Sequence, residues 1–163
     1  MNSNRSVLGG TIFVVVSAIA GGAMAASETV KAHAGAISPD ALKWGPAPPS
    51  LPKGAQAAVL AGDPGKPGLW TLRLKLPAGY KIPAHQHPTF EAATLISGTF
   101  NVGMGDKLDE AKADKLTAGS FIYLPANMNH FAFATTESVV QINSEGPFTI
   151  SYVNPADDPR KTQ

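Results

Sequence analysis

The sequence predicts an all-β fold, a single sandwich or barrel of short antiparallel strands. From Ala55 onward the chain consists of short alternating runs of apolar and polar residues. Gly, Pro, Asp or Asn interrupts these runs at intervals of roughly ten residues, which is typical of all-β domains. A length of 163 residues with 44% hydrophobic content suits one domain with its own core. The sequence shows no internal repeat, so we expect one barrel.

The N-terminus differs in kind from the rest of the chain. One positive charge, Arg5, precedes an apolar run over residues 7–20, and small residues follow up to Ala25. This order, with its Ala-x-Ala ending, is typical of a signal peptide that is removed after Ala25. The apolar run is shorter than the roughly 20 residues that a spanning helix needs. We therefore expect a periplasmic or secreted protein that has no membrane attachment once residues 1–25 are cleaved.

Residues 26–54 are expected to form an extended N-terminal arm, because they are rich in Ala, Gly and Pro and carry no periodic apolar pattern. The barrel domain is expected over residues 55–155, and a polar tail over residues 156–163. Residues 106–115 are charged and suit either a helical turn or a solvated loop. Within the barrel, strands are expected at 57–61, 69–76, 81–87, 91–97, 99–103, 120–124, 130–134, 138–143 and 149–153.

Composition argues against nucleic acid as a partner. Charged residues make up 15% of the chain and the formal net charge is +1, so no basic surface is available to neutralise phosphates.

The chain contains no cysteine, so it neither needs nor is harmed by an oxidising compartment. Cleavage of the leader would leave 12 basic and 12 acidic residues. A surface near zero charge does not oppose association, and a homodimer is the favoured assembly.

The clearest chemical signal comes from three histidines and one glutamate. Side chains on a strand alternate between faces, so His85 and His87 project to the same side with Cα atoms about 6.5 Å apart. Glu91 follows after a turn that can return its carboxylate to that face, and His130 opens a later strand. Together they could surround one ion and leave coordination positions for water or substrate.

Two glycine-led patterns contain these residues. The first runs through Gly79, His85, His87, Glu91 and Gly98, and the second through Gly119, Pro125 and His130. They resemble the two motifs of the cupin superfamily, and the resemblance covers about residues 55–153. It implies a cupin jelly-roll barrel, also called a double-stranded β-helix, with one divalent transition metal held by His85, His87, Glu91 and His130.

Two positions depart from the cupin pattern. Asn127 stands where the family usually has glycine, and Ala134 where it usually has asparagine. Asparagine is the next-best residue for a left-handed turn, so we expect that turn to be kept. Neither departure removes a ligand.

The predicted set of three imidazoles and one carboxylate does not select a single metal. Fe, Mn, Zn, Cu and Ni all suit it. Folding outside the cytoplasm favours Zn or Cu by the Irving–Williams order, whereas the cupin resemblance implies Fe or Mn for oxygen chemistry. No other cofactor is expected, and no residue near the four stands out as a general base.

The walls around the predicted site are expected to be small and apolar. Strand alternation places Ala93 and Leu95 on the Glu91 face, and Ala132 and Ala134 on the His130 face. Three aromatic residues are candidates for further lining, although such residues in barrel strands more often serve core or inter-sheet packing: Phe121, Tyr123 and Phe148.

Two functional classes follow from these features. The resemblance implies a metal-dependent enzyme, a dioxygenase-type oxidoreductase for a small organic molecule, with an isomerase or decarboxylase as variants. The alternative is a non-catalytic module that binds or senses a metal or ligand. A metal that serves stability alone is a third reading. Fold does not fix the reaction, so the sequence assigns no catalytic residue.

Overall fold

The computed structural model describes residues 35–161. The predicted signal peptide and the first part of the arm lie outside the described residues. The described part is built from strands, and its helices are short 3-10 turns at Pro39–Ala41, Glu110–Lys112, Pro155–Asp157 and Pro159–Lys161. None of the helices in residues 35–161 is long and apolar enough to cross a membrane.

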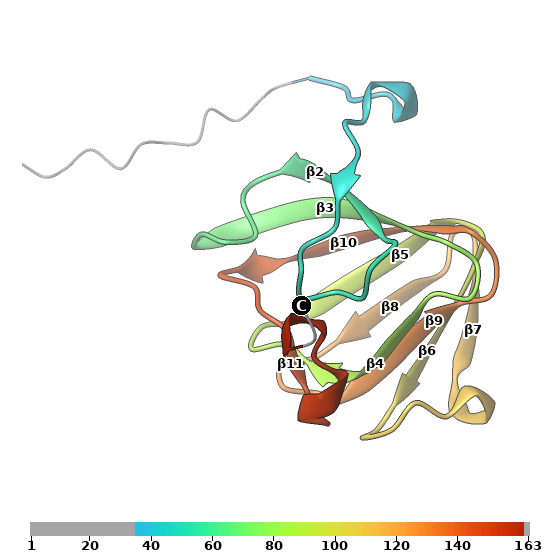
Figure 1. Cartoon of the computed structure of the whole chain (residues 1–163). Helices are drawn as coiled ribbons and strands as arrows, with labels where there is room; N and C mark the ends of the chain where they lie inside the picture. Colours follow the sequence, from blue (N-terminus) through green and yellow to red (C-terminus); the bar gives the residue numbers. More distant parts are fainter. Residues whose placement is uncertain (1–34, 162–163) are drawn as a thin grey trace, which may run out of the picture.

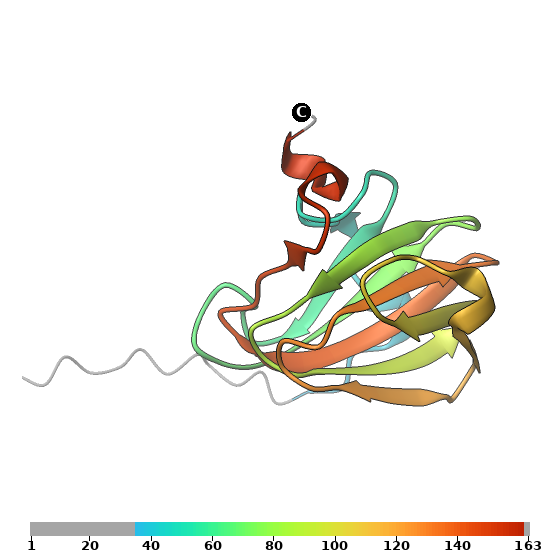
Figure 2. The same cartoon turned by 90° about the horizontal axis from the view of Figure 1, so that it is seen from below.

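Two antiparallel sheets face each other and enclose the core (Figures 1 and 2). One sheet has the order β1 (Gly45–Pro46), β2 (Gln56–Ala61), β3 (Gly68–Leu76), β10 (Ser138–Gly146), β5 (Glu91–Ser97) and β8 (Phe121–Leu124). The other has the order β11 (Ser151–Tyr152), β4 (Lys81–Gln86), β9 (His130–Ala134), β6 (Thr99–Met104) and β7 (Asp114–Thr117). The predicted all-β fold is confirmed.

Alternation along β3 and β10 shows why these sequences form a two-faced sheet. Trp70, Leu72, Leu74 and Leu76 of β3 are buried, and the residues between them face outward. On that outer face Thr71 Oγ1 donates a hydrogen bond to Asn143 Oδ1 (2.8 Å), and Arg73 Nε donates to Gln141 Oε1 (3.1 Å). Apolar burial on one face and polar pairs on the other fix the strand register.

The charged segment 106–115 contains more structure than either sequence reading proposed. A short helix at Glu110–Lys112 leads directly into β7, which pairs with β6. Leu108 and Ala113 pack against Phe131 and Phe133, which point to the outer face of β9. The segment therefore covers a sheet face that would otherwise expose aromatic rings, which a local charge pattern does not indicate.

The turn at Asn127 is left-handed, with φ of 60°, as the sequence analysis expected. Its backbone N–H donates to the carbonyl of His87 at 2.7 Å. The turn that precedes β9 is thereby fixed to the chain segment that carries the first histidine pair.

Candidate metal centre

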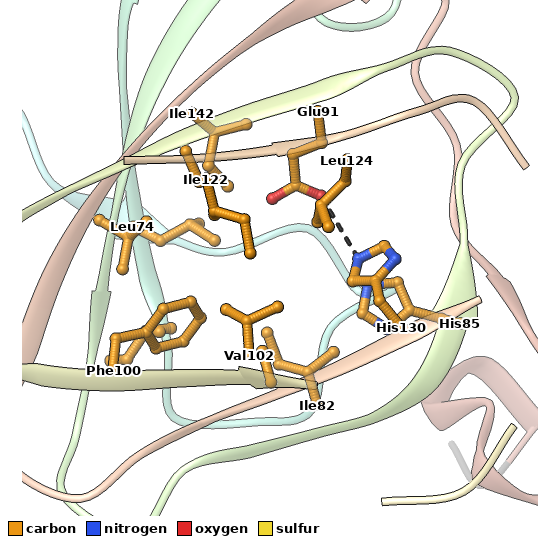
Figure 3. Close-up of a pocket in the computed structure, with 14 residues that line it drawn as sticks. Leu74, Ile82, His85, Glu91, Phe100, Val102, Ile122, Leu124, His130 and Ile142 are labelled. Atoms are coloured by element: carbon orange, nitrogen blue, oxygen red, sulfur yellow. Dashed lines mark ion pairs between the residues drawn. The ribbon is translucent and has the colours of Figure 1, made fainter. Parts of the chain in front are cut away.

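The four predicted residues come together at one end of the barrel. His85 lies in β4, His87 just past its end, Glu91 opens β5 and His130 opens β9. Their candidate ligand atoms all lie within 4.8 Å of one another. Glu91 Oε2 is 3.0 Å from His87 Nε2 and 3.6 Å from His130 Nε2. We call these four residues the His–Glu cluster; Figure 3 shows part of it.

An irregularity in β4 turns the side chain of His85 toward the other three residues of the cluster. His85 pairs with His130 and Ile82 pairs with Ala132, with a register shift between the two pairs. Strict alternation would place Ile82 and His85 on opposite faces, yet both line the barrel interior. The shift turns the end of β4 so that its histidine faces inward, as bulges beside functional sites often do.

Each imidazole is oriented by a backbone carbonyl. A carbonyl only accepts, so the Nδ1 atom that contacts it carries the hydrogen, and in the neutral ring Nε2 keeps its lone pair. The Nδ1 atoms of His85, His87 and His130 lie 2.7, 2.8 and 2.9 Å from the carbonyl oxygens of Pro83, Thr149 and Met128, in that order.

Burial determines the charge of the cluster. His85, His87 and His130 are 3 to 5% exposed. Burial, together with the neighbouring His130 and His87, lowers the pKa of His85 to about 3, so this ring is neutral at pH 7. Burial alone would raise the pKa of Glu91, but the imidazoles of His130 and His87 outweigh it and hold that pKa well below its usual range.

The donor set fits a cation. The Nε2 atoms of His87 and His130 lie 3.0 and 3.6 Å from Glu91 Oε2. A proton or a metal ion between the ring nitrogens and the carboxylate satisfies both at such distances. Three oriented imidazoles and a carboxylate form a set that could hold a divalent transition metal.

A pocket of about 540 Å³ opens onto the cluster, and we call it the outer pocket. Its floor includes His85, His87 and Glu91. One side is formed by residues 46–51 of the N-terminal arm, which we call the wall segment. Residues 148–150 also line the pocket.

Hydrogen bonds and ring contacts fix these walls to the cluster. The hydroxyl of Tyr152 donates to Ser50 O at 2.7 Å, and the hydroxyl of Tyr80 donates to Pro52 O. The Tyr152 ring centroid is 5.9 Å from that of His85. The Phe148 ring stacks on His87, with centroids 4.1 Å apart.

The structure corrects part of the predicted lining. Phe148 lines the outer pocket, but Phe121 and Tyr123 are 61% and 56% exposed on the outer face of β8. Ile122 and Leu124 take the inward positions of this strand, so the aromatic residues between them must point outward. The predicted faces of Ala93 and Ala132 are correct, because both side chains line the barrel interior.

Some lining residues carried no sequence signal. The wall segment was expected only as an extended arm, and Thr149 contributes a backbone carbonyl that any residue could supply. Their roles depend on contacts across long sequence separations, which no local pattern encodes.

Residues 29–151 match a family described as a domain of unknown function, DUF4437. The chain belongs to this family. No curated protein sequence matches it. Among solved structures, the fold is similar to a provisionally named acetylacetone dioxygenase from Methylibium petroleiphilum PM1. That protein is 25% identical, with a TM-score of 0.58 over 77% of this chain and 84% of the other.

Two further structures share the fold at lower identity. An RmlC-like cupin from Shewanella frigidimarina NCIMB 400 is 16% identical, with a TM-score of 0.52 over 67% of this chain and 87% of the other. A salicylate 1,2-dioxygenase from Pseudaminobacter salicylatoxidans is 18% identical, with a TM-score of 0.52 over 64% of this chain and 32% of the other. The DUF4437 chain described here is thus a cupin-fold protein.

Proposed function

We propose that this DUF4437 protein binds one divalent transition metal ion through His85, His87, Glu91 and His130 and is a dioxygenase-type enzyme for a small organic molecule. The observation that carries the proposal is the convergence of three carbonyl-oriented imidazoles and one carboxylate in a cluster of which His85, His87 and Glu91 line the outer pocket. When bound, such an ion would supply a Lewis-acidic, oxygen-activating centre. The provisionally named acetylacetone dioxygenase supports the choice of reaction class.

The residues of the chain would hold and orient both the ion and the organic molecule. The carbonyls of Pro83, Thr149 and Met128 keep the Nε2 atoms directed at one point. Phe148 stabilises His87 by stacking and presents an apolar surface to the pocket. The wall segment lines one side of the pocket.

The lining of the outer pocket indicates the class of substrate. Prolines of the wall segment, Val59, Leu72, Ile142 and Phe148 make it predominantly apolar. Apart from Glu91, the only charged residue in its lining is Asp63, which already accepts from Gly65 N–H and pairs with Lys66. Neither lysine nor arginine lines the pocket within residues 35–161. An uncharged, largely apolar molecule with an oxygen atom for the metal therefore fits best.

The proposed reaction narrows the choice of metal. Fe, Mn, Zn, Cu and Ni all suit the donor set, and oxygen chemistry requires a redox-active member of that group. We therefore place Fe, Mn, Cu or Ni ahead of Zn.

Export and assembly complete the proposal and rest on the sequence. Residues 1–25 have the pattern of a cleaved leader, and we infer a periplasmic or secreted protein that associates as a homodimer. The mass of the N-terminal peptide after export tests the cleavage, because it should begin at Ala26. Light scattering of the purified protein tests the assembly.

Oxygen uptake tests the proposed reaction. The metal-loaded protein would be screened against uncharged β-dicarbonyl and phenolic compounds in an oxygen electrode, beside His130→Ala. His33→Ala is the control, because His33 belongs to the sequence of the predicted arm and to neither cupin motif. We expect uptake with wild type and with His33→Ala, and none with His130→Ala. Metal binding without any turnover, together with ligand-dependent partner binding, would point to the sensing alternative.

A further inference from the structure

A second and smaller cavity lies behind the His–Glu cluster, inside the barrel (Figure 3). Its volume is about 30 Å³, and we call it the inner cavity. Side chains from both sheets point into it, among them Leu74, Val102 and Ile122. The cluster contributes His85, Glu91 and His130 to its lining.

The inner cavity and the outer pocket meet at the cluster. Leu74, Ile82, His85, Glu91 and Ile142 line both spaces. The outer pocket lies toward the wall segment, whereas the inner cavity extends into the core as far as Leu76 and Phe100, which are 0% and 6% exposed. The same donor atoms are therefore reached from two sides, one wide and one narrow.

The size of the inner cavity restricts its occupant. One water-sized probe needs about 10–15 Å³ by this measure of volume, so 30 Å³ admits a molecule of two or three atoms and no organic substrate.

The lining chemistry restricts the occupant further. Apart from the three cluster residues, all of its lining side chains are aliphatic or aromatic. Polar partners for a buried water lie only where the cavity meets the cluster, and the rest of its wall is apolar, the kind of lining that binds apolar atoms such as xenon.

We propose that the inner cavity binds a small apolar gas molecule, dioxygen in the proposed reaction, and delivers it to the cluster from the core side. The identity of the gas rests on the proposed function, but the capacity to bind an apolar gas does not. The two co-substrates would then approach from separate spaces, so the organic molecule in the outer pocket would not block the diatomic one.

Xenon is a suitable probe because it is apolar, heavy and unreactive. Crystals of the metal-free protein and of the metal-loaded protein would be pressurised with xenon, and the anomalous signal located. We expect a xenon atom in the inner cavity in both forms. Absence of xenon there, or xenon in the outer pocket alone, would overturn the proposal.

Matched alanine-to-valine variants separate the two spaces. Ala132 lines only the inner cavity, and Ala47 lines only the outer pocket. Ala132→Val should abolish the xenon peak, whereas Ala47→Val should keep it. Should Ala132→Val fail to fold, Val102→Ala enlarges the same cavity and should raise xenon occupancy. An unchanged occupancy in the folded variant would contradict the assignment.

A kinetic measurement links the cavity to turnover. With a substrate from the oxygen-uptake screen, Ala132→Val should raise KM for dioxygen by about tenfold and leave KM for the organic molecule unchanged. Ala47→Val should raise KM for the organic molecule and leave KM for dioxygen unchanged. Xenon binding without metal binding would overturn the proposed function and leave the gas site standing. Metal binding without xenon would overturn the gas site alone.

Discussion

The floor and the wall of the outer pocket are built by different means. The floor is formed by His85, His87 and Glu91 of the His–Glu cluster, whose residues belong to paired strands or lie beside them, and carbonyl hydrogen bonds orient all three imidazoles of the cluster. The wall segment is a proline-rich stretch with one short strand pairing, and the tyrosines at 80 and 152 hold its far end. In the proposed function, the barrel would therefore fix the metal ligands, whereas the wall segment, a separable element, would govern substrate choice.

Removing a cluster residue should have the largest effect of any change. His130→Ala deletes one of four candidate ligands and leaves Glu91 without one of its imidazole partners. We expect metal affinity to fall by more than about 100-fold, beyond the cost of losing an outer-shell partner. Isothermal titration with Mn²⁺ and Zn²⁺ measures this, with His33→Ala as the matched control. Equal metal affinity in His130→Ala and His33→Ala would show that the cluster is not the metal-binding site.

Low pH should lower the free energy of unfolding of the metal-free protein, because His85 at the floor of the outer pocket is buried in its neutral form. His85 has a pKa of about 3 when folded, below its ordinary value of 6.5, so the unfolded chain binds the proton more readily. The contribution of neutral His85 to the free energy of unfolding is fully present above pH 6.5. It is lost as the pH falls from 6.5 toward 3, at about 1.4 kcal/mol per pH unit.

Urea unfolding of the metal-free protein between pH 7 and 4 measures this loss. The control is His85→Gln, which carries no titrating group at this position and should show a shallower decline. Parallel curves for the two proteins would refute the assignment of the proton to His85.

Phe148 packs against the floor of the outer pocket by stacking on His87, and its removal should have an intermediate effect. Phe148→Ala deletes the stack on His87 and the edge contact with Trp70, whose centroid lies 4.8 Å away. Because Phe148 is only partly buried, we expect a loss of about 2 kcal/mol, less than for a fully buried phenylalanine. Metal content should persist, since the carbonyl of Thr149 still orients His87.

The control for Phe148→Ala is Phe121→Ala. Phe121 is 61% exposed on the outer face of β8, and its removal should change stability by less than about 0.5 kcal/mol. Thermal denaturation of the two variants side by side decides whether the stack matters.

Loosening the wall alone should have the smallest effect on stability. Tyr152→Phe removes the hydroxyl that donates to Ser50 O and keeps the ring beside His85. We expect a loss of about 1 kcal/mol, faster amide exchange at Ala47 and Leu51, and unchanged metal content. Tyr123→Phe, at an exposed position, should match wild type in all three. Loss of metal from Tyr152→Phe would mean that floor and wall are not separable.

The same division explains how much the sequence could predict. His85, His87 and Glu91 were predictable because their spacing is local, and the left-handed Asn127 needs only its own backbone preference. His130 lies 39 positions beyond Glu91, and the resemblance to the second cupin motif placed it with them. The wall was not predictable, because its hydrogen bonds join residues 28 and 102 positions apart. The β4 irregularity that turns His85 inward was likewise invisible to a strict two-residue period.

Strand β7 and the inner cavity show two other limits of sequence patterns. Asp114 and Lys115 made β7 resemble a solvated loop, and only Leu116 is buried in that strand. The inner cavity depends on how side chains from two sheets fill the volume between them. The alternation of apolar and polar residues along a strand does not predict such a cavity.

Elemental analysis of the purified protein tests the central claim most directly. Wild type would be compared with the His85→Ala/His130→Ala double variant, both purified from the periplasmic or secreted fraction that the proposal predicts. We predict close to one equivalent of Fe, Mn, Cu or Ni in wild type and none in the variant. One equivalent of Zn would retain the metal site and contradict oxygen activation, whereas only trace metal in wild type would contradict the account as a whole.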